Sequence, residues 1–218
     1  MPTRTHTLLL AVVILLLGMA QPAAAAETSA GGRAVGELIE FVGSVAVLRS
    51  SGSGRLAAGD QIYEQDLIVT GADGRAKIRF EDGTTLSIGS GSQLSIVEFL
   101  GPTAATASTR RGVLSLLVGI VRAIVSPRTE RPGLDIDTRV AVASVRSTDL
   151  MVESAPKGTA TVALEGEVAV SSKPPGPVET VMLTEGMGTD VVPDGPPSPP
   201  ARWGAARVAD FLDRTRVP

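Results

Sequence analysis

The side chains best spaced for chemistry are two carboxylates, Asp135 and Asp137, which lie two residues apart beside Thr138. In an extended strand such residues share one face, so the two carboxylates would project together. Paired carboxylates can bind calcium or serve as an acid and a base in catalysis. The sequence offers no evident third or fourth oxygen ligand, and we therefore interpret the pair as part of a solvated strand face.

The chain is poor in the residues that most enzymes and metal sites use. It has no Cys and a single His, His6, which falls in a predicted signal peptide. Without it, neither a Ser-His-Asp nor a Cys-His apparatus nor a typical zinc site can form. The segment Gly89–Ser92 lacks the Lys of a phosphate loop, and no helix follows it. The sequence thus predicts no catalytic residues, no metal site and no cofactor, which favours a protein that is not an enzyme.

Residues 1–26 have the layout of a secretory signal peptide, with an apolar run, Leu8–Ala20, followed by small residues, Ala24–Ala26. The run is shorter than the roughly 20 residues that span a bilayer as a helix. Cleavage would leave a periplasmic or secreted chain without a membrane span; an uncleaved N-terminal anchor is the alternative. The net charge of −3 gives no general attraction for nucleic acid.

Strand patterns fill the rest of the chain up to residue 192. Apolar residues alternate with charged ones from Ala76 to Ile88, which is the period of half-buried strands. The apolar run Val113–Val125 fits a strand better than a helix, because Gly119 and β-branched residues interrupt it. We predict an all-β fold, either a wrapped or solenoid-like β domain or, alternatively, a β-sandwich. A weak echo links residues 43–59 with residues 166–186 and favours a doubled β-topology.

The turn at Asp82-Gly83 can be predicted more closely. A two-residue turn would set Phe80 opposite Thr85 and place polar residues against the apolar face. Pairing Phe80 with Leu86 keeps the apolar residues together and requires an odd loop. We therefore expect a three-residue loop or a glycine bulge at Gly83.

The C-terminal region has a different character. Residues 193–200 form a Pro-rich linker, and residues 201–218 predict an amphipathic helix. The helix could fold back on the β domain, or it could act as a tethered arm for a partner. The candidate partner-binding residues on its apolar face are Trp203, Val208, Phe211 and Leu212.

Three blocks of this sequence resemble the FecR-type periplasmic domain of the iron-dicitrate regulator family. The first is Gly43–Val47 with Leu56–Asp60. The second joins Thr70-Gly71 to residues 80–86, and the third joins residues 137–148 to residues 165–168. The resemblance implies a FecR-like β domain over residues 34–192. The chain has Ser147 where the family usually has glycine, so we expect a different local turn geometry there.

The residues of these blocks are most simply structural. Glycines at such positions allow a positive φ, neighbouring Asp residues form turns, and Arg146 shares parity with core residues. A buried Arg needs a carboxylate or several carbonyl partners, and its alternative role is contact with an anionic ligand. The predicted structural residues are Gly59, Asp60, Thr70, Gly71, Phe80, Asp82, Gly83, Arg146 and Thr148.

The resemblance implies an exported module that senses a signal or binds a protein of the cell envelope. Regulators of the family carry a cytoplasmic anti-sigma segment before a membrane helix, whereas only seven residues precede the apolar run here. We therefore expect no direct anti-sigma role. The alternative is a cell-wall or polysaccharide-binding structural protein, for which Trp203 and Tyr63 are the aromatic residues on offer.

Overall fold

The computed structural model describes residues 32–99, 112–125 and 133–217 of the chain. The predicted signal peptide lies outside these residues. So do all of residues 101–111, where the Thr-, Ala- and Ser-rich sequence indicates a loop, and most of residues 126–133, where the sequence indicates a turn. No helix in the described part of the chain is both long enough and apolar enough to cross a membrane. The strands are β1 (Ala34–Val42), β2 (Val45–Arg49), β3 (Gly52–Arg55), β4 (Gln61–Tyr63), β5 (Leu67–Thr70), β6 (Arg75–Phe80), β7 (Thr85–Ile88), β8 (Gln93–Glu98), β9 (Gly112–Ile124), β10 (Leu134–Asp137), β11 (Ala141–Val145), β12 (Asp149–Ala155), β13 (Gly158–Glu165), β14 (Val168–Ser172), β15 (Thr180–Leu183), β16 (Met187–Val191) and β17 (Ala201–Arg202), and one helix follows, α1 (Ala205–Thr215).

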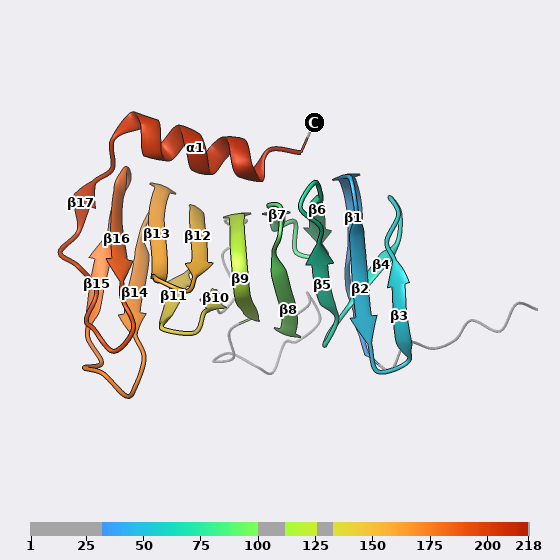
Figure 1. The fold of residues 1–218 in the computed structure, drawn as a ribbon, viewed down its shortest axis with the longest axis horizontal. Coiled ribbons are helices and arrows are strands. Elements are labelled where there is room, and N and C mark those ends of the chain that lie inside the picture. The colour runs from blue at the N-terminus through green and yellow to red at the C-terminus, as the bar shows by residue number, and fades with distance from the viewer. Residues whose placement is uncertain (1–31, 100–111, 126–132, 218) are drawn as a thin grey trace, which may run out of the picture.

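The strands form one 17-stranded sheet that is arranged in two layers (Figure 1). The first layer has the order β4-β1-β6-β7-β9-β12-β13-β16-β17. The second has the order β3-β2-β5-β8-β9-β10-β11-β14-β15. The chain winds back and forth between the layers, so the predicted all-β, wrapped form is confirmed. The sheet is open and does not close into a barrel.

Strand β9 joins the layers because it belongs to both. Its N-terminal half pairs with β8 and β10 in the second layer, and its C-terminal half pairs with β7 and β12 in the first. The strand predicted over residues 113–125 is thus confirmed. The change of layer occurs at Gly119, which has a φ of 106°. A Cβ at this position would clash with Ser92, whose Oγ accepts a hydrogen bond from the Ile120 N–H at 3.1 Å.

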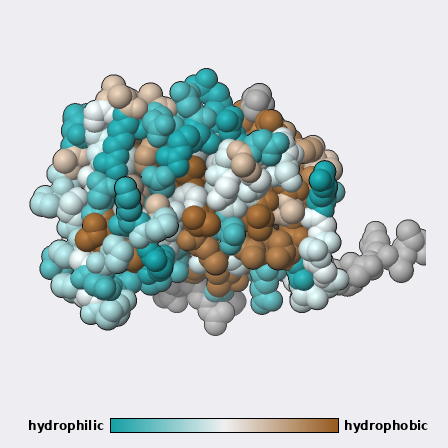
Figure 2. All heavy atoms as spheres, in the orientation of Figure 1, coloured by the Kyte–Doolittle hydropathy of each residue, from teal (hydrophilic) through white to brown (hydrophobic). Residues whose placement is uncertain are grey.

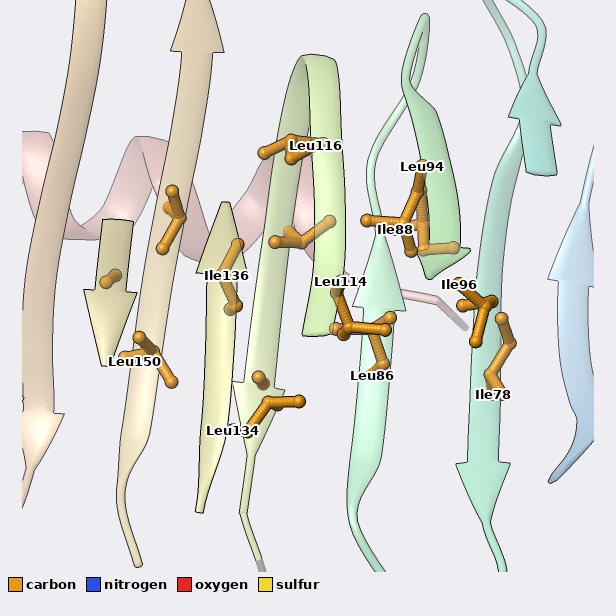
Figure 3. Packing of buried hydrophobic residues seen from close by; sticks show 14 of the residues in the cluster. Ile78, Leu86, Ile88, Leu94, Ile96, Leu114, Leu116, Leu134, Ile136 and Leu150 are labelled. Carbon is orange, nitrogen blue, oxygen red and sulfur yellow. The ribbon is translucent and has the colours of Figure 1, made fainter. Parts of the chain in front are cut away.

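The hydrophobic core lies between the layers and is almost entirely aliphatic (Figure 3). Most strands contribute alternate residues to it, as Ile78, Leu86 and Ile88 do from the first layer and Leu94 and Ile96 from the second. All five of these side chains have no exposed surface. Burial of a side chain of this size stabilises a fold by about 1.5–3 kcal/mol, so the packing between layers is the main source of stability.

The echo seen in the sequence corresponds to a structural repeat at the two ends of the sheet. Strand β1 pairs with β4 and β2 with β3, while β13 pairs with β16 and β14 with β15. Equivalent glycines make equivalent hydrogen bonds: the Gly59 N–H donates to the Leu38 carbonyl and the Gly186 N–H to the Ala163 carbonyl, both at 2.8 Å. The doubled topology therefore has a physical basis in matching strand pairs.

The turn between β6 and β7 has the predicted odd loop but a different register. The loop is residues 81–83, and Gly83 has a φ of 87°. However, Ile78 lies opposite Leu86, and the Phe80 N–H donates to the Thr84 carbonyl at 2.9 Å, so Phe80 does not face Leu86. The predicted register was wrong by two residues. Parity fixes which face is buried, but a shift of two residues preserves that face, so only loop closure decides between the two registers.

We expect Gly119→Ala to destabilise the protein by about 1–3 kcal/mol, because the new Cβ requires a strained φ and displaces Ser92. Urea denaturation monitored by circular dichroism measures the change. The matched control is Gly54→Ala, where a Cβ would meet open space and φ is not positive, and its effect should stay within about 0.5 kcal/mol. Equal stability of the two variants would contradict the role given to Gly119.

Candidate interaction surface

Two of the predicted structural residues, Asp60 and Asp82, stabilise turns through their carboxylates. The Asp60 carboxylate accepts a hydrogen bond from the Ala57 N–H at 2.8 Å, and the Asp82 carboxylate accepts from the Thr84 N–H at 2.7 Å. Short polar side chains of this kind satisfy backbone donors that the turn leaves unpaired. Within the described part of the chain, neither residue belongs to a group of His, Cys, Asp or Glu side chains that could hold a metal ion.

Two different physical requirements explain the glycines among the predicted structural residues: a positive φ, or close approach of neighbouring atoms. Gly59 has a φ of 93°, like Gly83 in the positive range. Gly71 does not have a positive φ, so the expectation for this residue was wrong. A Cβ on Gly71 would come within 3.2 Å of both Asp73 and Ser44, and close backbone approach explains the residue instead.

Thr70 and Phe80 occupy buried structural positions. The Thr70 Oγ1 donates to the Gly89 carbonyl at 2.6 Å and accepts from the Ser92 N–H at 2.9 Å, which ties the end of β5 to the loop before β8. The Phe80 ring stacks on Phe99 with centroids 4.1 Å apart. Both side chains are thereby fixed by this chain's own contacts.

Arg146 lies on the surface, contrary to the expectation from parity. The core-facing residues of β11 are Ala141, Ala143 and Val145, so Arg146 points outward at the start of the next turn. The parity argument failed because the break before Ala141 shifts the alternation by one residue. No ion pair of the Arg146 guanidinium is found among the described residues.

The turn that carries Arg146 forms one wall of a hollow of about 450 Å³, which we call the Arg146 hollow. Two separate blocks of the sequence meet there, because the Thr148 Oγ1 donates a hydrogen bond to the Glu167 carbonyl at 3.0 Å. Gly166, with a φ of 74°, lets the second block pass close to the Ser147 carbonyl. The hollow is lined by Ser144, Val145, Arg146, Ser147, Thr148, Gly166, Glu167, Ala169 and Met182.

The carboxylates Asp135 and Asp137 lie on one face of β10. Leu134 and Ile136 lie on the opposite face of this strand and point into the core. Asp137 pairs with Lys173, whose Nζ lies 2.9 Å from Oδ1. Lys173 also donates to the Thr138 carbonyl at 2.9 Å. Across the described ranges, no group of three His, Cys, Asp or Glu residues could hold a metal ion.

Sequence reasoning missed the most deeply buried ion pair of the described residues, Arg49 with Asp66. The Asp66 side chain is 2% exposed and receives Nε of Arg49 at 2.7 Å, Nη2 at 2.9 Å and the Tyr63 N–H at 2.9 Å. The hydrogen bond to Asp66 raises the pKa of Arg49 despite the opposing effect of burial. The sequence gives only a weak indication of this ion pair, namely a single Asp directly before an apolar strand.

A second pair joins two strands of the first layer. Arg122 on β9 donates to both carboxylate oxygens of Asp149 on β12, at 2.9 and 2.6 Å. This bidentate hydrogen bonding raises the pKa of Arg122, again against the effect of burial. Both missed pairs use an Arg and an Asp far apart in sequence, so only the strand order brings them together.

The C-terminal helix begins at Ala205, later than predicted, and lies across the strands of the first layer (Figure 1). Its residues Val208, Phe211 and Leu212 pack with Trp203 on the outer face of that layer, against Met151 and Val162 among others. A Cβ at Gly188 would clash with the Trp203 ring, so the strand surface is shaped for this contact. The linker before the helix is also bound to the layer, since the Thr189 Oγ1 donates to the Ser198 carbonyl at 2.7 Å.

Three arginine contacts hold α1 in place. The Arg207 guanidinium lies 3.5 Å from the centroid of the Trp203 ring and pairs with Asp190. Arg214 pairs with Glu153 of β12. Burial lowers the pKa of Arg214, but hydrogen bonds to Glu153 and Asp210 outweigh this effect and raise it. A partner could reach the buried Trp203 and Phe211 only if α1 left the sheet.

Removal of the carboxylate in Asp66→Ala should destabilise the protein by about 2–4 kcal/mol, because Arg49 and the Tyr63 N–H lose a buried partner. Glu37→Ala is the control, since the Glu37–Arg79 pair is exposed and such pairs contribute at most about 1 kcal/mol. Thermal and urea denaturation of both variants provide the comparison. Similar losses in the two would show that burial of the Asp66 pair has no energetic consequence.

Phe211→Ala should release α1, lowering the free energy of helix opening by about 3 kcal/mol. The helix has 11 residues and no side-chain N-cap, and isolated helices shorter than about 12–15 residues are marginal in water. Hydrogen exchange should show faster exchange in residues 205–215 and unchanged protection in β12 and β13. Asp213→Ala, at an exposed position of the same helix, should leave the exchange of α1 unchanged.

Known protein structures include two with a fold similar to this one. Two crystal structures of a candidate anti-sigma factor from Parabacteroides distasonis ATCC 8503, at 1.65 and 2.50 Å resolution, are similar to it. Each has 18% sequence identity and a TM-score of 0.51, covering 66% of this chain and 62% of that one. At this identity the likeness concerns the fold, and this chain spans less than two thirds of the length of those proteins. No curated protein matches the chain.

A family comparison is more specific. The pattern described as FecR protein matches residues 66–169, from the buried Asp66 to the second wall of the Arg146 hollow. The match contains the second and third blocks of the resemblance, whereas Gly43–Asp60 precedes it. Residues 66–169 of this chain are therefore similar to the FecR protein family.

Proposed function

We propose that this protein is a non-enzymatic, exported FecR-domain module that senses a signal or binds a protein in the cell envelope. The observation that carries the proposal is the Arg146 hollow. There, two blocks of the FecR match that are distant in sequence come together. The Arg146 side chain between them is exposed and forms no ion pair with any described residue. An uncompensated guanidinium beside apolar Met182 and Ala169 suits a partner with a carboxylate and an apolar contact.

The proposal concerns sensing and not inhibition of a sigma factor. The similar structures are named as candidate anti-sigma factors, but this chain spans 62% of their length and shares 18% identity. We therefore carry over a regulatory role of the module, in the periplasm or outside the cell, and no cytoplasmic activity. Polysaccharide binding has weaker support, because Trp203 is buried under Arg207 and Tyr63 lies under Arg49.

Crosslinking of the full chain in its native envelope tests the proposal. We expect the wild-type protein to capture a defined protein and Arg146→Ala to capture several-fold less, since an interface Arg often contributes more than about 1 kcal/mol. Arg55→Ala is the matched control, an exposed Arg at the other end of the sheet. Retention on purified wall material without any captured protein would refute the proposal in favour of polysaccharide binding.

A further inference from the structure

Four strands pair on one side only within the described residues: β3 and β15 in the second layer, and β4 and β17 in the first. An edge strand presents unpaired N–H and C=O groups to any extended chain, and proteins protect such edges by shortness, charge, Pro or bulges. Strands β4 and β17 have three and two residues. Only β3 and β15 are long enough to template another strand.

The structural repeat makes β3 and β15 equivalent, which allows a direct comparison. Strand β3 has the sequence Gly-Ser-Gly-Arg, with two glycines that weaken strand formation. Strand β15 has the sequence Thr-Val-Met-Leu, rich in residues that favour strands. The sequence of β3 thus disfavours pairing with a further strand, whereas the sequence of β15 favours it.

Apolar side chains also gather at the β15 edge. Val178, Met182 and Val192 are 65%, 54% and 56% exposed, more than any other large apolar side chain of the described residues. The segments that carry Val178 and Val192 approach one another, because Gly176 packs against the Asp194 backbone. Figure 2 shows hydrophobic residues reaching the surface at the left end of the molecule, where Figure 1 places β15.

Ladder geometry shows which backbone groups of β15 are free. The Ser172 N–H donates to the Glu179 carbonyl at 3.0 Å, so Glu179 faces β14. In an antiparallel pair the residues alternate between facing the partner strand and facing away from it. Thr180 and Met182 therefore direct their N–H and C=O groups outward, toward an additional strand.

The charges around the edge indicate the chemistry of its occupant. Glu179 and Glu185 flank β15, are exposed, and form no ion pair within the described part of the chain. Pairing with a second copy would bring four carboxylates to one interface. A segment with basic residues at its ends and apolar residues between them complements both features.

We propose that β15 binds an extended segment of a partner protein as an added antiparallel or parallel strand, with alternating apolar residues flanked by Lys or Arg. This inference rests on the proposed interaction function and assigns it to one edge. Backbone hydrogen bonds to Thr180 and Met182 supply affinity, and contacts with Val178 and Met182 cover apolar surface. The outer end of the Arg146 hollow, formed by Met182, is continuous with this edge.

A synthetic peptide tests the edge directly. The probe is fluorescein-labelled Lys-Val-Thr-Val-Thr-Val-Lys, titrated with the full chain and measured by fluorescence anisotropy. Met182→Pro removes an outward N–H without removing a bond to β14, and it should weaken binding at least tenfold. The matched control is Arg55→Pro at the equivalent position of β3, and its affinity should equal that of the wild-type protein. A peptide with Glu in place of both Lys should bind at least tenfold more weakly.

A second measurement guards against misfolding of the Pro variant. A probe with alternate backbone N–H groups methylated should lose binding to the wild-type protein itself. No binding of the unmodified probe, or equal binding by Met182→Pro, overturns the assignment. A dimer of the full chain in analytical ultracentrifugation that Met182→Pro dissociates would overturn it too, since the occupant would then be a second copy. Capture of an envelope protein equally by wild-type protein and Met182→Pro would refute the edge and leave the proposed function standing.

Discussion

The structure depends on contact between two β layers that share one aliphatic core. The chain has no Cys and thus no disulfides, and its few aromatic residues leave the core to Val, Ile, Leu and Ala. Neither layer could bury its inner face alone. Strand β9 links the layers covalently and by pairing, and Gly119 provides the φ that lets one strand serve both.

This constraint explains why the ends of the molecule resemble one another. A two-layer sheet must close each end by passing between the layers, and both ends use the same pairing of first with fourth and second with third strand. The backbone solution recurs, including the glycine hydrogen bonds, while side chains on the outer strands have diverged. Leu56 and Leu183 both fill the core, one at each end of the sheet.

Much of the fold could be predicted from the sequence, because alternation directly reports which face of a strand is buried. Register could not, as the β6–β7 turn shows: a shift of two residues leaves the pattern of burial unchanged. Arg146 was misplaced because a turn changed the parity just before β11. The Arg49–Asp66 pair was missed because it depends on packing between β2 and the end of the β4–β5 turn, which no local pattern records.

The two surfaces that could meet a partner at the C-terminal end are independent of one another. Helix α1 covers the outer face of the first layer, whereas β15 lies at the edge of the second. A strand added to β15 would extend the second layer away from β14 and would not displace Trp203 from Gly188. Binding at the edge therefore requires no opening of α1, and release of α1 would expose a different, apolar surface around Met151 and Val162.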